Sequence, residues 1–323
     1  MAQEFRWYLG KRVIYLVLTV FLILSFNFLL FRVMPGDVTS MRGVTPETAA
    51  IMRDYYGLNH SLPEQYVIFL QQTFTGHFGK SIDYRKGTEV SAILGAPLTN
   101  TLILVGSGTI ISIAAGIYLG RTTAWHRGKN IDRLGSAFFL TFYCMPTFLF
   151  ALVLLKLFGD YVPDWPVKGA FGANYDNLDI IGKFEDRLLH TLLPLAALVI
   201  ETVATFSIIT RSSLIDVMTE EYMVTAVAKG LRAKQVLHNH AMPNAMLPVV
   251  TVVAMNVGWI LSGSIMIEVI FSYQGLGYLT YEAVLGYDYP LLQAAFMLEA
   301  VAVVLANFIA DLMLFKLDPR VKL

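Results

Sequence analysis

The acidic residues that could do chemistry in this sequence lie inside long apolar stretches. Glu201, Glu268, Glu299 and Asp311 each fall within a run of mostly hydrophobic residues. A carboxyl group at membrane depth is costly, so it usually faces other protein groups or a water-filled path. Glu201 lies deepest, and it is a candidate either for a transport pathway or for a helix–helix hydrogen bond. Glu268 and Asp311 lie near the ends of their runs, where we expect contact with solvent.

The other reactive side chains do not form a catalytic or metal-binding pattern. The six histidines show no ligand spacing with cysteine or carboxylate, and the single cysteine, Cys144, has no partner for an intrachain disulfide. Gly79-Lys80-Ser81 looks like the end of a nucleotide-binding loop, but that loop needs a glycine where this chain has Phe74. We therefore expect a chain that is not an enzyme and binds no cofactor or metal itself.

The elements that position the acidic residues are six apolar segments. The chain has 323 residues, of which 56% are hydrophobic and 15% charged, against about 25% charged in a soluble domain. A helix needs about 20 mostly apolar residues to cross a bilayer. The segments that meet this length are 13–31, 101–119, 134–158, 188–209, 246–270 and 291–315. They are continuous and show no alternating pattern, so we predict an all-α integral membrane protein.

Lysine and arginine are distributed unevenly between the two sides of these spans. They are concentrated in the N-terminus, in the loops after the second and fourth spans, and in the C-terminal tail, whereas the loop at 159–187 is acidic. Basic loops stay in the cytoplasm, so we predict that both termini are cytoplasmic. The chain then divides into the N-terminus with the first helix (1–33), an extracytoplasmic cap loop (34–97), a transmembrane core (98–315) and a cytoplasmic tail (316–323).

The cytoplasmic loop between the fourth and fifth spans is rich in helix-forming residues. Residues 220–239 carry apolar side chains at irregular helical spacing, and Gly230 interrupts them. This pattern favours a short amphipathic helix, broken at Gly230, on the membrane surface. Such a helix can dock in the groove of a soluble partner, although an ordinary connector has the same pattern.

The segment 220–245 resembles the coupling motif of the permease subunits of ABC importers. Thr225, Ala226, Gly230 and Pro243 fall at the spacings of the motif's small residues, glycine and proline. Val224 replaces the motif's glutamate and a histidine replaces its isoleucine, which is common in the dipeptide/oligopeptide branch. The resemblance assigns the following residues to ATPase coupling: Tyr222, Thr225, Ala226, Lys229, Gly230, Leu231, His240, Pro243 and Asn244.

Further motifs of the dipeptide, oligopeptide and nickel permease branch follow in order along nearly the whole chain. They are FRVMPGD at 31–37, LPEQY at 62–66, GKS at 79–81, FSYQGLG at 271–277, DYP at 288–290, ADL at 310–312 and LDPR at 317–320. The resemblance implies a type I ABC importer permease fold with about six transmembrane helices, an extracytoplasmic cap loop and a cytoplasmic coupling helix. It also implies that the protein lies in the inner membrane of a prokaryote.

The resemblance further implies that this chain is one subunit of a larger complex. A second homologous permease would complete the pathway, two ATP-binding-cassette chains would hold ATP and Mg²⁺, and an extracytoplasmic binding protein would deliver cargo. No nucleic acid is expected. The cargo would be a di- or oligopeptide, with an oligosaccharide or nickel as alternatives.

Two other classes of protein fit part of the sequence. The first is an ion-coupled secondary transporter or channel, in which Glu201 and Asp311 would be the coupling groups. The second is an intramembrane enzyme or assembly factor. In the importer reading, Glu201, Asn256 and Ser262 are the candidate residues of the translocation pathway.

Overall fold

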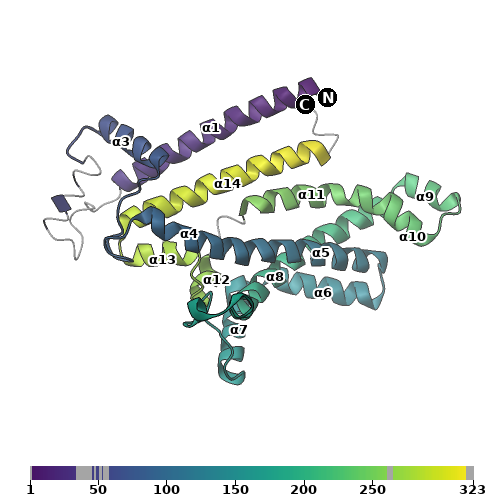
Figure 1. The fold of residues 1–323 in the computed structure, drawn as a ribbon. Helices are drawn as coiled ribbons and strands as arrows, with labels where there is room; N and C mark the ends of the chain where they lie inside the picture. The colour runs from purple at the N-terminus through teal and green to yellow at the C-terminus, as the bar shows by residue number, and fades with distance from the viewer. Residues whose placement is uncertain are drawn as a thin grey trace.

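Every named element in the described part of the chain is helical. The structure is a computed structural model that describes residues 2–33, 46, 49–50, 53, 58–259 and 265–317, with side chains for all of these except 2–6, 33, 254–259 and 313–317. Most of the long helices lie side by side along one direction (Figure 1). This arrangement confirms the predicted all-α fold class.

Four helical segments are long and apolar enough to cross a bilayer. They are α1 (Ala2–Val33), the continuous run of α4 (Val90–Thr101), a π-helical turn (Leu102–Gly106) and α5 (Ser107–Trp125), then α8 (Ile180–Met218) and α14 (Tyr289–Leu317). They contain the first, second, fourth and sixth predicted spans. Each helix is longer than the apolar stretch that predicted it, because polar residues at both ends continue the helix.

The third predicted span, 134–158, is wrong as a single straight helix. α6 (Asn130–Cys144) and α7 (Thr147–Tyr161) meet at an angle of 97°. Met145 and Pro146 lie between them with non-helical ψ values of 126° and 127°. A proline ring disfavours a helical backbone at the preceding residue, so α6 ends before Met145 and α7 begins after Pro146.

The fifth predicted span, 246–270, corresponds to two helices. α11 (Met242–Trp259) covers its first part and α12 (Ile265–Ile270) covers its last part. Residues 260–264 lie outside the described ranges. The number of six spans therefore stays a prediction.

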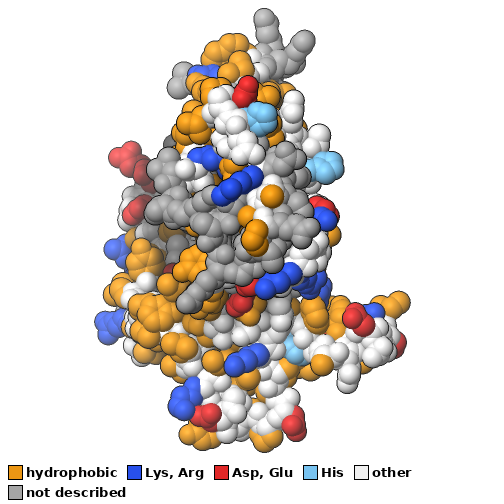
Figure 2. All heavy atoms as spheres, turned by 90° about the vertical axis from the view of Figure 1, so that its left-hand side faces the viewer, with side chains coloured by type: hydrophobic (Ala, Val, Ile, Leu, Met, Phe, Trp, Pro, Cys, Tyr) orange, Lys and Arg blue, Asp and Glu red, His pale blue; other side chains and the backbone are white. Residues whose placement is uncertain are grey.

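The predicted cap contains α3 (Leu62–Thr75), which lies at the end of the molecule opposite the start of α1 (Figure 1). The backbone N–H of Ser61 donates to the carboxylate of Glu64 at 3.0 Å, which lowers the pKa of Glu64 and begins the helix. Gly76 ends it with φ of +73°. The hydroxyl of Tyr66 bonds to Ser25 of α1 at 2.7 Å. Seen from this end, the described surface mixes charged side chains of both signs with apolar ones (Figure 2).

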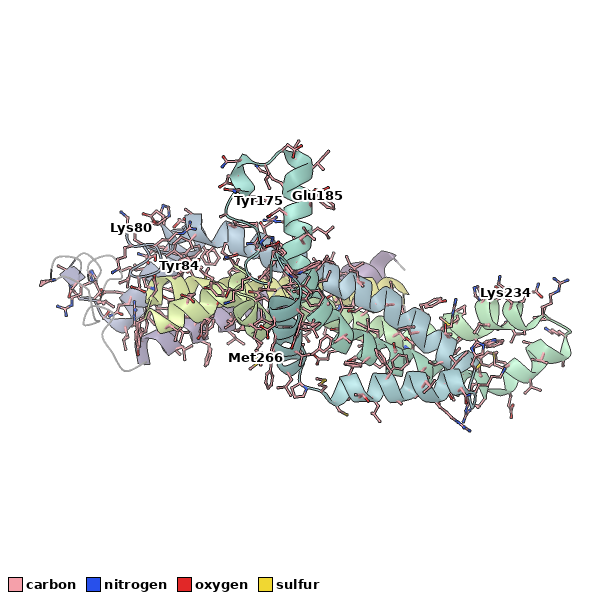
Figure 3. All side chains as sticks on the ribbon, turned by 90° about the horizontal axis from the view of Figure 1, so that it is seen from below. Lys80, Tyr84, Tyr175, Glu185, Lys234 and Met266 are labelled. Carbon is pink, nitrogen blue, oxygen red and sulfur yellow. The ribbon has the colours of Figure 1, made fainter. Side chains whose placement is uncertain are left out.

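The shorter elements lie at the two ends and at one side of the bundle. They are a 3₁₀ turn (Tyr175–Asn177), α9 (Glu221–Ala228), α10 (Ala233–Val236), a π-helical turn (Leu237–Ala241) and α13 (Leu276–Leu285). α9 and α10 lie at the same end as the start of α1 (Figure 1). Tyr175 and Glu185 lie on an arm that projects sideways, between Lys234 toward one end and Lys80 toward the other (Figure 3). We call residues 162–179 together with the first turns of α8 the arm.

α5 and α8 form the tightest helix–helix contact around which the bundle is built. Four small residues recur at every fourth position of α5: Gly108, Ser112, Gly116 and Gly120. A Cβ atom added at Gly116 would lie 2.4 Å from Cβ of Phe206, and one added at Gly120 would lie 2.5 Å from the carbonyl oxygen of Ser207. Small residues at this spacing let membrane helices approach closely. We call this contact the α5–α8 seam.

Candidate functional site

The coupling segment predicted at 220–245 is a helix–turn–helix at the end of α8. α9 ends at Ala228, and Gly230 has φ of +75°, a backbone conformation that glycine adopts without strain. The N–H of Gly230 donates to the carbonyl of Val227 at 2.9 Å, and α10 begins at Ala233. The structure thus has the short helix and the break at Gly230.

The two faces of α9 have different surroundings. Met223 and Ala226 are buried in a cluster with Leu214 of α8. The opposite side is apolar but open, since Val224 is 69% exposed and Val227 61% exposed. Val224 and Val227 are three positions apart and therefore neighbours on the helix, and we call them the apolar ridge of α9. Exposed apolar neighbours outside the predicted spans are typical of a surface that contacts another protein.

The nine predicted coupling residues do not all lie on the open side of the segment. The exposed members are Tyr222, Thr225, Lys229, Gly230, Pro243 and Asn244. Leu231 and His240 are half-buried, and Ala226 is buried inside the chain's own core. The small size of Ala226 therefore lets α9 pack against its own chain. Partial burial, with Glu220 nearby, raises the pKa of Tyr222, so its phenol stays neutral at physiological pH.

The coupling segment is held to the predicted membrane helices by contacts with α8 and α11. The hydroxyl of Ser213 on α8 donates to the carbonyl of Ala245 on α11 at 2.8 Å. Leu214, Ala241 and Ala245 have no exposed surface. The amide of Asn244 donates to the carbonyl of His240 at 2.8 Å, next to the π-helical turn. Displacing α9 would therefore disturb the contacts of α8 and α11.

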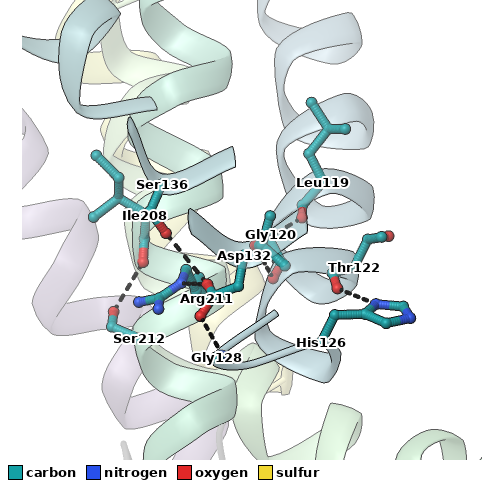
Figure 4. A network of polar contacts seen from close by, with 11 residues as sticks. Leu119, Gly120, Thr122, His126, Gly128, Asp132, Ser136, Ile208, Arg211 and Ser212 are labelled. Atoms are coloured by element: carbon teal, nitrogen blue, oxygen red, sulfur yellow. Dashed lines mark hydrogen bonds and ion pairs between the residues drawn. The ribbon is translucent and has the colours of Figure 1, made fainter. Parts of the chain in front are cut away.

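A buried ion pair braces α8 close to this segment (Figure 4). The Nε of Arg211 donates to Oδ1 of Asp132 at 2.7 Å. The N–H of Gly128 donates to Oδ2 of Asp132 at 2.9 Å, and the hydroxyl of Ser136 donates to Oδ1 at 3.3 Å. The side chain of Asp132 is 7% exposed and that of Arg211 is 28% exposed. The pair joins the first turn of α6 to α8, and the N–H of Gly128 adds the loop between α5 and α6 to this contact. The sequence alone did not indicate this role.

The three predicted pathway residues are not brought together by the described structure. Glu201 is half-buried on α8, and its carboxylate makes no hydrogen bond or ion pair with any residue that the structure describes. The alternative role as a helix–helix hydrogen bond is therefore not seen among these residues. Asn256 belongs to α11, but its side chain lies outside the description, and Ser262 lies outside the described ranges. Their place in a pathway stays a prediction.

Glu268 is fully buried, so the expected contact with solvent is wrong for this residue. Its Oε1 accepts from the hydroxyl of Thr101 at 2.8 Å, and its Oε2 accepts from the N–H of Tyr278 at 3.0 Å. The hydroxyl of Thr101 also accepts from the N–H of Leu276 at 2.8 Å. The reason for the burial is that the turn after α12 folds back over the carboxylate, with Gly275 directly against it.

The neighbouring polar residues extend this contact to two more elements. The amide nitrogen of Asn100 donates to the carbonyl of Gln274 at 2.8 Å, and Arg187 of α8 donates to the amide oxygen of Asn100 at 3.0 Å. The side-chain oxygen of Gln274 accepts from the N–H of Ala170 in the arm at 2.7 Å. We call Asn100, Thr101, Arg187, Glu268 and Gln274 the polar junction. It joins α4, α8, α12 and the arm.

The loop that mimics a phosphate-binding motif holds a carboxylate of its own chain. Oδ2 of Asp288 accepts from the hydroxyl of Ser81 at 2.5 Å. The same oxygen accepts from the backbone N–H groups of residues 82, 83 and 84 at 3.0, 3.1 and 3.2 Å. The carboxylate of Asp288 therefore occupies the donors of this loop, and the loop holds the start of α14 against the cap.

Among the described residues, no group of three or more His, Cys, Asp or Glu side chains is placed to hold a metal ion.

Comparison with known proteins places this arrangement in a transport family. Residues 112–323 match the family described as binding-protein-dependent transport system inner membrane component, and residues 5–92 match the N-terminal membrane component of such systems. A probable peptide ABC transporter permease of Sinorhizobium fredii is 30% identical over 98% of this chain and 99% of its own length.

Two further relatives cover almost the same range. A di/tripeptide transport system permease of Pseudomonas aeruginosa is 31% identical over 98% of both chains. An oligopeptide transport system permease of Bacillus subtilis is 32% identical over 92% of this chain and 93% of its own length. The chain therefore belongs to the binding-protein-dependent transport system inner membrane components, and it is a multi-pass, pore-forming permease subunit of an ABC importer.

Proposed function

We propose that this permease forms one half of a pathway for di- or oligopeptides, and that α9 receives the motion of an ATPase partner. The cargo is supported by the relatives, whose names refer to peptide, di/tripeptide and oligopeptide transport. They match over nearly the whole chain, so the likeness is not confined to a shared core.

The observation that carries the coupling role is the apolar ridge of Val224 and Val227 on α9. The ridge belongs to a short helix whose other face is packed into its own chain. A soluble groove can receive such a helix, and the buried face transmits any displacement to α8 and α11. Contact between the ridge and an ATPase would therefore move the membrane helices.

A permease that is moved by an ATPase requires several partner chains. A second, homologous permease would complete the pathway, and two ATP-binding-cassette chains would bind ATP and Mg²⁺ beneath the pair. An extracytoplasmic binding protein would deliver the peptide. This chain itself would bind no cofactor. The start of α1 and α9 lie at the same end (Figure 1), which supports a cytoplasmic position for both termini.

In the proposed cycle, closure of the ATPases on ATP pulls α9, and α8 follows because α9 is packed on its last turns. The Asp132–Arg211 pair and the α5–α8 seam make α5 and α6 follow α8. The pathway then opens away from the cytoplasm, and hydrolysis reverses the shift. ATP acts here by stabilising one of two arrangements.

The test is a paired substitution, Val224→Glu with Val227→Glu. Both side chains are exposed, so the change should leave folding intact while placing two charges on the ridge. Loss of two apolar anchors should lower the recovery of ATPase chains on the tagged permease at least about tenfold. ATP-dependent uptake of a labelled dipeptide should fall with it.

The matched control is Val67→Glu, an exposed valine of α3 at the opposite end. It should leave the recovery of ATPase chains unchanged. Full recovery of ATPase chains on the Val224/Val227 variant would contradict the coupling role. Uptake of nickel or an oligosaccharide, with no competition by dipeptides, would contradict the cargo and leave the coupling role standing.

A further inference from the structure

A groove of about 200 Å³ lies between α1 and α14, at the end of the bundle that also carries α9. Its upper part is lined by Arg12 of α1 and Asp311 of α14, and its deeper part by Thr19, Asn307 and Phe308. α1 is the helix at the edge of the bundle (Figure 1), and most of its side chains face outward. The groove is therefore open to whatever surrounds the protein at the membrane surface.

Beside the rim of the groove lies one positive charge that no described carboxylate offsets, that of Lys11. The guanidinium of Arg12 pairs with the carboxylate of Asp311, and its Nε donates to the hydroxyl of Tyr8 at 3.1 Å. An arginine has five N–H donors, so three stay available. Lys11 is exposed, and no carboxylate of the described residues lies within ion-pair distance of it. Among the described side chains the Arg12–Asp311 pair is neutral, and Lys11, which lies over the lining residue Tyr15, adds one positive charge beside the groove.

Aromatic rings surround Lys11 and Arg12, as is typical of side chains at a membrane–water interface. The Nζ of Lys11 lies 5.2 Å from the ring centre of Trp7 and 5.9 Å from that of Tyr15. Arg12 lies 5.2 Å from the ring centre of Tyr8. Tryptophan and tyrosine gather where hydrocarbon meets the lipid headgroups. The rim therefore lies at the depth of phosphate groups.

Polar side chains continue below the rim. Asn307 lies one helical turn deeper than Asp311, and Thr19 lies about 10 Å deeper than Arg12 along α1. Both are exposed, and neither side chain makes a hydrogen bond within the described part of the chain. An amide exposed to hydrocarbon without a partner is costly. Asn307 therefore needs hydrogen-bond acceptors at a depth where a lipid has its ester carbonyls.

We infer that this groove binds one anionic phospholipid. Its phosphate would accept from Lys11 and from the remaining N–H groups of Arg12, and its ester carbonyls would accept from Asn307 and Thr19. Leu22 and Phe26, which are exposed, follow Thr19 at helical spacing and would contact an acyl chain. Free phosphate meets only the rim, so it does not explain Asn307. Basic pockets between helices at this level suit acidic headgroups.

The test uses the complete transporter in nanodiscs that contain equal amounts of phosphatidylglycerol and phosphatidylethanolamine. Native mass spectrometry should show one phosphatidylglycerol retained in preference to phosphatidylethanolamine. Lys11→Gln should lower that retention about fivefold, the effect of one lysine near an anionic surface. Asn307→Leu, which removes the hydrogen bonds to the ester carbonyls, should lower it by a similar factor. Both variants leave the Arg12–Asp311 pair in place. Lys156→Gln, which removes an exposed lysine of α7, is the matched control and should change nothing.

A second measurement identifies the occupant directly. Asn307→Cys, in a chain where the exposed Cys144 is replaced by alanine, can be crosslinked to a photoreactive phosphatidylglycerol. Crosslinking to the lipid is expected. Crosslinking to the second permease, or equal retention of both lipids by the unmodified transporter, would overturn the proposal. Unchanged recovery of the ATPase chains would show that each variant is assembled, so a folding defect cannot imitate the expected loss.

Discussion

Replacing Gly116 by alanine should destabilise this protein although it adds only one methyl group. The new Cβ would lie 2.4 Å from Cβ of Phe206 and 3.2 Å from both the amide nitrogen of Ser207 and the carbonyl oxygen of Val203. Two carbon atoms in contact prefer about 3.5–4.0 Å, so α5 and α8 would have to separate by about 1 Å here. Two of the three atoms belong to backbone, which cannot turn aside. Overpacking of this kind costs about 1–3 kcal/mol.

Thermal unfolding of the purified permease in detergent measures this loss, with Gly95→Ala as the matched control. A Cβ added at Gly95 of α4 meets no atom within 4 Å. Alanine is about 1 kcal/mol better than glycine inside a helix, so the control should be neutral or stabilising. Both variants share this gain in helix propensity, so at roughly 2 °C per kcal/mol for a chain of this size Gly116→Ala should melt about 2–6 °C below Gly95→Ala. Equal melting of the two variants would refute the close packing of the seam.

Two further changes test the polar contacts at the two ends of α8. Asp132→Ala leaves the half-buried Arg211 without its carboxylate and should lower the free energy of unfolding by about 2 kcal/mol. The control Asp216→Ala, on the same helix as Arg211, should lower it little. Equal losses in the two variants would contradict a stabilising role of the Asp132–Arg211 pair. Glu268→Ala leaves the hydroxyl of Thr101 without an acceptor and should make the turn after α12 accessible to limited proteolysis. Glu268→Gln keeps the shape of the side chain, so this turn should be cleaved more slowly than in Glu268→Ala. Equal cleavage of the two variants would contradict the role of the polar junction.

The long helices were predictable because their apolar length leaves few alternatives. A run of hydrophobic residues and the charge of the neighbouring loops were enough to predict α1 and α8 from the sequence. The bend between α6 and α7 was not predictable in size. Pro146 marks the place, but a proline fits a kink or a break, and the angle of 97° depends on packing of α7 against α8 and α12. That packing involves residues far away in the sequence.

In the candidate site too, local features were predictable from the sequence, whereas contacts between residues far apart in the sequence were not. α9 and its break at Gly230 follow from local spacing, and both are present in the structure. Asp132 and Arg211 are 79 positions apart, and Thr101 and Glu268 are 167 apart, so no local pattern pairs them. The α5–α8 seam did leave a local signal, a small residue at every fourth position of α5. That spacing indicates a close helix contact but does not identify α8 as the partner.

α8 runs from the sideways arm to the coupling segment and so limits how the permease can move. Its 39 residues have a length of about 58 Å along the helix, more than the thickness of a bilayer with its headgroups. Its first turns carry Arg187 of the polar junction, and its last turns carry Arg211 and the base of α9. The α5–α8 seam stiffens the part between them. We therefore expect a pull on α9 to tilt the part of α8 after Pro194 together with α5, because Pro194 is the proline inside α8 and the place where the helix bends most easily. Where α8 does not bend at Pro194, movement of the coupling segment displaces the polar junction as well.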